Sequence, residues 1–449
     1  MSPESAPLGA HARATLKSIV ERYTTLTRLG HDLGHSFQWV WRIVFCAKSF
    51  PLEKADEILR KLAVPRRFYF DQLCGDEAEP GPTFVLDFFR EAQRLPPAPF
   101  LAANLDRLRA LATLKPVAAG EPQLHDEGQR ELEALRFRDS DGALATLENS
   151  LLTLAAETEQ ECTRGRLADL ATLLAIWSTT QMSQGRRTDA CDALLAAFAL
   201  AEASRNRRTL AICWQRGAYL LADVAQFRHA HRFIEKAALE LGLAAAYERL
   251  PGTLIGRGIF RQALGRLDES IEDLKTARKQ LPAEDWRLYA MASNALAVSY
   301  ELQGNLPAAR AALSEAVAAW KVDDLGRAPL LWRRGSLALA EGQLAEADTA
   351  LRGAMILYEK YGDPLDCALV ALDLAKCLVR RQKLSVLREL GRQVLAWRPL
   401  FATNPIAAAA MIDLSCTLER AAAEARIKAE ALAKLSEKLK ATDLRRRPA

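Results

Sequence analysis

The residues best placed to do chemistry are two histidines four positions apart, His31 and His35, with a carboxylate between them. On one face of a helix this spacing can bind zinc. Gly34 argues against a helix through this segment, and no third ligand is evident. His229 and His231 are only two positions apart and would point in different directions on a helix. We therefore expect no metal site, no cofactor and no catalytic residue.

Other features of the sequence also argue against an enzyme. Glycine-rich phosphate-binding loops, the dinucleotide-binding fingerprint and the serine nucleophile elbow are all missing from it. The eight cysteines form no Cys-x-x-Cys pair and mostly fall in apolar helical stretches, as reduced core cysteines of a cytoplasmic protein do. No apolar run approaches the roughly eighteen residues that a membrane span needs. Basic and acidic residues, 61 and 56, nearly balance. We expect a non-enzymatic cytoplasmic protein without membrane contact.

The strongest pattern is a set of turn residues that recur every 38 to 40 positions: Gly185, Ala225, Gly265, Gly304, Gly342 and Gln382. A small residue lies seven positions before each of them, and in all but the last repeat another lies five positions after. Periods of this length are typical of helical repeat arrays. Glycine suits the end of a helix because it accepts a positive φ angle. Each unit is therefore predicted to be a helical hairpin, such as Trp286–Leu302 followed by 307–320, and the fold all-α.

These units resemble the tetratricopeptide repeat (TPR) family, through residues such as Ala297, Tyr300, Gly304, Ala309, Leu313 and Ala316. The resemblance covers about 160–400 and implies a solenoid of helical hairpins wound into a right-handed superhelix. We place the array of six to seven hairpins at 124–400, with 124–158 as a degenerate first hairpin. The family period of about 34 residues is stretched here, which longer helices or longer loops between repeats would explain.

In TPR arrays the first helix of each hairpin lines a concave groove. Transferring those positions gives candidate contacts for a protein or peptide ligand: Gln215, Tyr219, Asn294, Glu301, Trp332, Lys376 and Arg380. Ordinary solvated or packing positions are the alternative reading. Only Lys376 and Arg380 are basic, so the clamp with which some family members grip a terminal carboxylate is missing. A mixed polar and apolar groove for a helix or an extended peptide fits better.

A second resemblance lies before the repeats, in Leu33-Gly34-His35-Ser36, Val40-x-Arg42-Ile43 and Leu62-Ala63-Val64. This register is similar to the Cro/C1-type helix-turn-helix, which implies a small helical bundle over 11–72. Candidate DNA contacts are Ser36, Gln38, Arg42 and Lys48. The predicted recognition helix has few long polar side chains, although residues 1–70 carry eleven basic against six acidic residues. DNA binding and a protein-contact role, such as packing or homodimer formation, both stay open.

Two further segments complete the expected organisation. Residues 73–123 form a linker with proline-rich breaks and two amphipathic helices, 84–95 and 101–114, that we expect to dock on the first repeat. Residues 404–440 are predicted to be a capping helix with a basic tail. We expect a TPR regulator whose N-terminal domain is controlled by a ligand in the groove. The alternative is a pure interaction scaffold whose N-terminal domain does not bind DNA.

Overall fold

The computed structural model describes part of the chain, which divides into two compact units, 80–377 and 1–79 with 378–449. The described residues are 5–6, 50–51, 97–124, 128, 131–132, 135, 139–223, 226–282, 284–322, 325–361, 364–396, 414 and 437. The four candidate DNA contacts, all but two residues of the predicted 11–72 domain, the predicted helix 84–95 and nearly all of 404–440 lie outside the described residues. The domain bounds therefore stay predictions.

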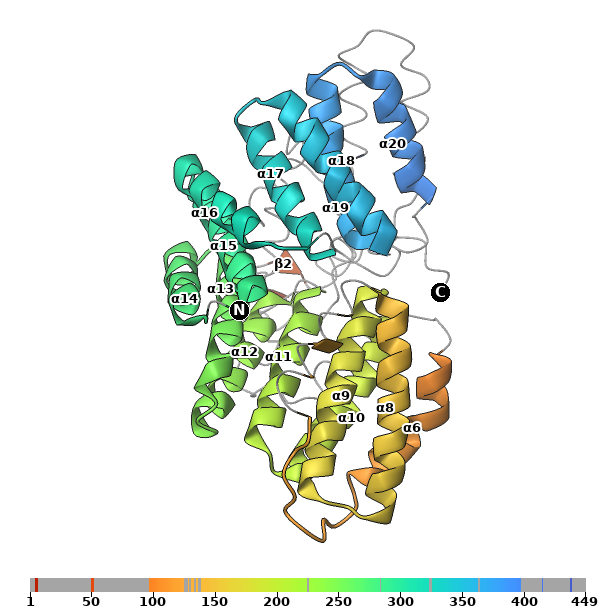
Figure 1. Cartoon of the computed structure of the whole chain (residues 1–449). Helices are drawn as coiled ribbons and strands as arrows, with labels where there is room; N and C mark the ends of the chain where they lie inside the picture. The colour runs from red at the N-terminus through yellow and green to blue at the C-terminus, as the bar shows by residue number, and fades with distance from the viewer. Residues whose placement is uncertain are drawn as a thin grey trace. The chain divides into compact units, whose positions relative to one another are not determined.

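Helical hairpins make up most of the described part of 164–361 (Figure 1). The packed pairs are α9 (Arg164–Ser183) with α10 (Arg187–Ser204), α11 (Arg207–Asp223) with α12 (Phe227–Leu243), α13 (Leu250–Ala263) with α14 (Leu267–Gln280), α15 (Trp286–Leu302) with α16 (Leu306–Ala319), and α17 (Ala328–Ala340) with α18 (Leu344–Tyr361). The helices α19 (Pro364–Arg380) and α20 (Leu384–Ala396) follow in the chain. The two-residue strands β1 (Ser5–Ala6) and β2 (Phe50–Pro51) pair antiparallel. The prediction of an all-α solenoid of TPR-like hairpins is confirmed.

Each described turn residue of the repeat pattern has a positive φ angle. The φ angles are 76° at Gly185, 77° at Gly265, 78° at Gly304 and 77° at Gly342. Gln382 takes the same role with a φ of 57°, although it has a side chain. Ala225 lies outside the described residues. The repeat pattern thus marks the sharp turn between the two helices of each hairpin.

The small residues on either side of the turns let the two helices of a hairpin pack closely. Where the first helix carries glycine, the reason is steric. A Cβ added at Gly258 would lie 2.8 Å from Leu274 Cγ, and one added at Gly335 would lie 2.5 Å from Leu351 Cγ. In both hairpins, the leucine nine positions after the turn residue fills the space over a glycine seven positions before it.

Short connecting elements account for part of the stretched period. The 3-10 helices η3 (Tyr247–Arg249) and η4 (Leu325–Arg327) lie between hairpins, directly before α13 and α17. Several helices are also long, with 20 residues in α9 and 18 in α10 and α18. Both of the expected sources of extra length are therefore present.

Helix α6 (Pro99–Leu111) packs at the start of the array, against α8 (Ser140–Gln160) and α10. Its apolar side is buried at Leu101, Leu108 and Leu111. Polar contacts fix its ends: the Ala98 amide donates to Asp189 Oδ1 at 3.2 Å, and Arg107 pairs with Glu159 at 2.7 Å. The amphipathic pattern at 101–114 thus belongs to a helix that packs on α8 and α10. Among the described helices, none is long and apolar enough to span a membrane.

Candidate protein-binding surface

The first helices α11, α13, α15, α17 and α19 each have one side that does not pack on the second helix of their hairpin. We call these sides together the first-helix face. On α15 it is formed by Met291, Asn294, Val298 and Glu301, spaced by three and four residues, and all four are half-buried or exposed. Leu296, on the opposite side of the helix, is 1% exposed. Since the first helices of neighbouring hairpins pack side by side, this face continues from one hairpin to the next.

The seven predicted groove residues lie on four of these helices. Gln215 and Tyr219 are in α11, Asn294 and Glu301 in α15, Trp332 in α17, and Lys376 and Arg380 in α19. The first five are half-buried, and the two basic residues are exposed. Their role as ligand contacts stays a prediction.

Adjacent first helices contact each other at a recurring position, nine residues before the turn residue. Gly256 occupies this position in α13, and the Tyr219 hydroxyl of α11 lies 2.9 Å from where its Cβ would be. Ala295 occupies it in α15, and its carbonyl accepts from Gln262 Nε2 of α13 at 3.0 Å. The residue at this position thus receives a side chain from the preceding hairpin.

The next two junctions place charged residues at the same position. Arg333 of α17 pairs with Glu301 of α15 at 2.7 Å. Asp373 of α19 accepts from two side chains of α17, the Trp332 indole at 2.9 Å and the Ser336 hydroxyl at 3.1 Å. Tyr219, Glu301 and Trp332, predicted as groove residues, therefore also hold neighbouring hairpins together. Their partners at 256, 333 and 373 are absent from the predicted contacts, although each lies nine residues before a turn residue.

Lys376 is also engaged by a neighbouring group. Its ammonium lies 2.8 Å from Asp373 Oδ1, one turn earlier on the same helix. The carboxylate that joins α17 to α19 thus also neutralises this lysine.

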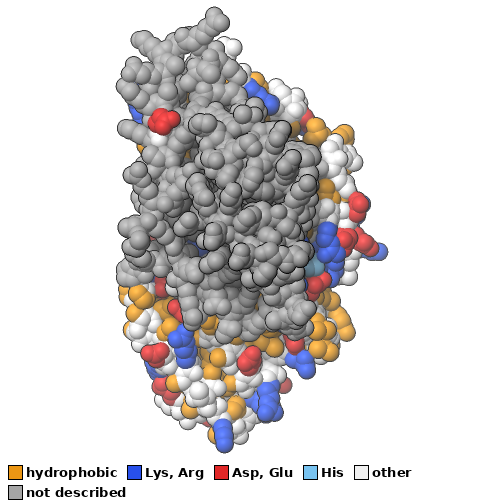
Figure 2. All heavy atoms as spheres, turned by 180° about the vertical axis from the view of Figure 1, so that it is seen from behind, with side chains coloured by type: hydrophobic (Ala, Val, Ile, Leu, Met, Phe, Trp, Pro, Cys, Tyr) orange, Lys and Arg blue, Asp and Glu red, His pale blue; other side chains and the backbone are white. Residues whose placement is uncertain are grey.

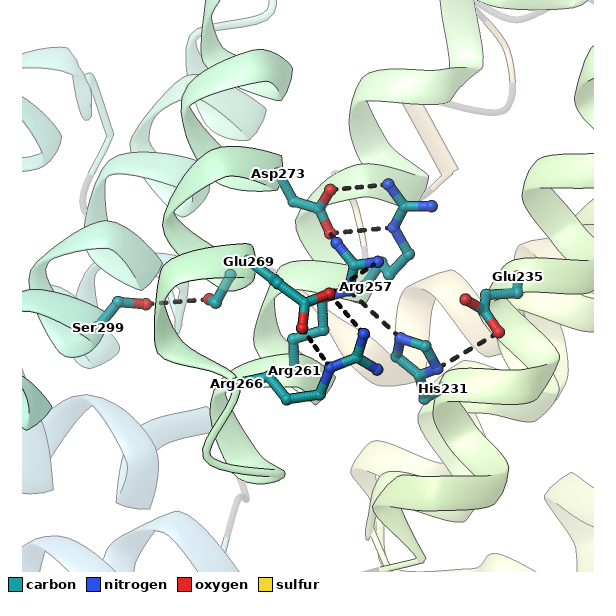
Figure 3. Close-up of polar contacts among 9 residues, drawn as sticks. His231, Glu235, Arg257, Arg261, Arg266, Glu269, Asp273 and Ser299 are labelled. Carbon is teal, nitrogen blue, oxygen red and sulfur yellow. Dashed lines mark hydrogen bonds and ion pairs between the residues drawn. The ribbon is translucent and has the colours of Figure 1, made fainter.

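A second polar network joins α12, α13 and α14 (Figure 3). Asp273, only 7% exposed, binds two guanidinium groups: Arg257 through two hydrogen bonds of 2.9 and 2.7 Å, and Arg261 through one of 2.7 Å. The hydrogen bond with Asp273 raises the pKa of Arg257. Arg261 also donates through Nε to His231 Nε2 at 3.4 Å. This network connects the α11/α12 hairpin to the next one.

In the described part of the chain, the structure shows neither a metal-binding group nor a disulfide bond. There, no group of three or more His, Cys, Asp and Glu side chains is arranged to hold a metal ion. His31 and His35 lie outside it. The five described cysteines are free and buried: Cys162, Cys191, Cys213, Cys367 and Cys377.

One stretch of the array matches a model of a known protein family. Residues 249–321, from just before α13 to just after α16, match the Tetratricopeptide repeat family model. The resemblance predicted from sequence is thus confirmed for these two hairpins. No curated protein matches the chain.

Two solved structures are similar in arrangement. One is "Crystal structure of APC/C hetero-tetramer Cut9-Hcn1", at 13% identity and a TM-score of 0.43, with 93% of this chain and 74% of that chain covered. The other is "Crystal Structure of the Yeast Tom70", at 15% identity and a TM-score of 0.43, with 97% of this chain and 86% of that chain covered.

Proposed function

We propose that this protein is a non-enzymatic scaffold that binds a protein or peptide on its first-helix face. The observation that carries the proposal is the surface of α15, within the stretch that matches the TPR model. Met291 is 40% exposed there and Leu302 58% exposed, with Asn294 and Val298 between them. A helix that presents exposed apolar side chains among polar ones fits a partner with both apolar and hydrogen-bonding groups.

Charge on the described surface favours the same class of partner. On the face drawn in Figure 2, basic, acidic and hydrophobic side chains of the described residues lie interspersed. Nucleic-acid-binding surfaces instead gather Lys and Arg on one side. Along the first-helix face, Arg333 and Lys376 each have an acidic partner. We therefore assign the array to protein binding.

Site-specific photocrosslinking in cells tests this proposal. A photoreactive residue replaces Met291 on the first-helix face, or Ile356, which is 62% exposed on the second helix α18. The two sites are matched in being exposed apolar positions in hairpin helices. We expect a discrete protein adduct from position 291 and none from position 356. Equal adducts from both positions, or an adduct only from 356, contradict binding on the first-helix face.

A finer proposal is that residues 11–72 form a DNA-binding domain and that the array controls its activity. In this proposal the protein acts in the cytoplasm. The register from Leu33 to Val64 supports it, with Ser36, Gln38, Arg42 and Lys48 as contacts. The full-length protein should bind genomic DNA fragments with an affinity that falls steeply with salt, and Arg42→Ala should weaken it. Unchanged binding in Arg42→Ala, or no binding at 50 mM salt, leaves the scaffold reading in which this domain packs or forms a homodimer.

A further inference from the structure

His231 lies where two hairpins meet. It belongs to α12, the second helix of one hairpin, and its side chain is 9% exposed. Arg261 of α13 reaches it from the following hairpin and binds Asp273 of α14 at the same time. The imidazole is therefore part of the contact between the α11/α12 and α13/α14 hairpins (Figure 3).

The geometry of this contact fixes the protonation state of His231. The Nε–H of Arg261 points at His231 Nε2 from 3.4 Å, so Nε2 must accept and carries no proton. The other ring nitrogen, Nδ1, lies 3.4 Å from Glu235 Oε2 and carries the proton of the neutral ring. A second proton could bind only at Nε2, where it would face the Arg261 guanidinium. The junction as folded thus requires a neutral imidazole.

The charged groups that surround the imidazole come from three helices and a turn. Glu235 of α12 favours the protonated ring, whereas Arg257 and Arg261 of α13 and Arg266 of the following turn oppose it. Glu269 and Asp273 of α14 pair with these arginines. Charged residues of the other elements packed against α12 have partners elsewhere: Arg207 with Glu240, Arg208 with Glu248 of η3, and Asp223 with Arg187 of α10.

We propose that this junction is a pH-sensitive hinge, at which protonation of His231 weakens the contact between the two hairpins. The proton would remove the acceptor for Arg261 and place a cation beside arginines in a site with little water. Burial lowers the pKa of His231 below its usual value, and the three arginines act in the same direction. The closed junction therefore binds fewer protons than the open one, and its stability falls as the pH drops below about 6.5.

Hydrogen exchange of the full-length protein, followed by mass spectrometry at pH 7.5 and 5.5 and corrected for the intrinsic rate, tests the hinge. We expect peptides covering 227–243 and 250–263 to lose protection at pH 5.5. One proton limits the increase in opening to about tenfold per pH unit. His231→Gln keeps a neutral acceptor for Arg261 and a donor for Glu235, and should remove this pH response. His229→Gln, a buried histidine two positions away on the same helix, is the matched control and should keep it.

A second variant covers the case in which His231→Gln does not fold. Glu235→Gln removes the one neighbouring charge that favours the protonated ring, so it lowers the pKa of His231 in the closed junction further, and the loss of protection at pH 5.5 should be at least as large as in the wild type. The hinge is refuted by wild-type protection that does not change with pH at these peptides. It is also refuted by an unchanged response in His231→Gln, by its loss in His229→Gln, or by a smaller loss of protection at pH 5.5 in Glu235→Gln than in the wild type.

Discussion

Leu351 fills the space that any side chain at position 335 would need, because a Cβ added to Gly335 would lie 2.5 Å from Leu351 Cγ. Gly335→Ala must therefore push apart α17 and α18, at a cost of about 1–3 kcal/mol in the free energy of unfolding. Urea unfolding followed by circular dichroism measures this. The control is Gly242→Ala in α12, where an added Cβ meets nothing within 4 Å. Equal stability of the two variants would contradict the steric account.

At the turn between α15 and α16, the free-energy cost of a positive φ angle can be measured separately from any steric clash. Gly304 has a φ of 78° and open space around the position of a Cβ, so Gly304→Ala introduces no clash. We expect a loss of about 1–2 kcal/mol from backbone conformation alone. The reverse change, Gln382→Gly, should raise the stability of its turn, because Gln382 holds a φ of 57° against the preference of its side chain. Thermal unfolding of both variants shows whether the two shifts have opposite signs.

Asp373 is the acceptor that joins α17 to α19. Asp373→Ala leaves the Trp332 indole and the Ser336 hydroxyl without their acceptor, and we expect a loss of about 1–3 kcal/mol. Asp373→Asn keeps a carbonyl oxygen for these donors and gives up the exposed ion pair with Lys376, which is worth at most about 1 kcal/mol. Equilibrium unfolding should therefore rank the wild type first, Asp373→Asn second and Asp373→Ala last. A larger loss in the asparagine variant would mean that charge, not hydrogen bonding, dominates this junction.

We expect the Cys213 thiol not to react with alkylating reagents in the folded protein. It is fully buried in α11, and burial raises the pKa of its thiol. Alkylation at pH 8 followed by mass spectrometry should leave Cys213 unmodified until the hairpin opens. Cys162, at 8% exposure, should react earlier. Raising the pH from 7 to 9 should accelerate alkylation of an unfolded control peptide, whereas Cys213 should stay unmodified at both pH values as long as the hairpin is closed. Labelling at the rate of that peptide would refute the buried placement.

The sequence predicted the hairpins well because their determinants are local. Glycine at 304, flanked by Ala297 and Ala309, identifies both the turn and the faces that pack, and the predicted 286–302 agrees with α15 to the residue. Even Gln382 was placed correctly, since the spacing of its neighbours outweighed its unusual residue type.

The contacts between hairpins could not be predicted in the same way. They depend on how far one hairpin is rotated and shifted against the next, and the residue type at the receiving position changes from one junction to another. Gly256, Ala295, Arg333 and Asp373 share an offset from the turn but no chemistry. The bond between the Trp332 indole and Asp373 is one such contact, and the sequence pattern that predicts Trp332 as a ligand contact does not indicate it.

Because these contacts differ from one junction to the next, the hairpins pack correctly only in their present order. Moved to follow α11 and α12, the hairpin that starts with α17 would bring Arg333 against the Tyr219 ring, which now rests on Gly256, and would lose Glu301. The residue at the receiving position of each first helix thus fits the side chains of the first helix that precedes it. The repeats share a shape, yet they cannot be shuffled, duplicated or deleted at will without breaking a junction on each side.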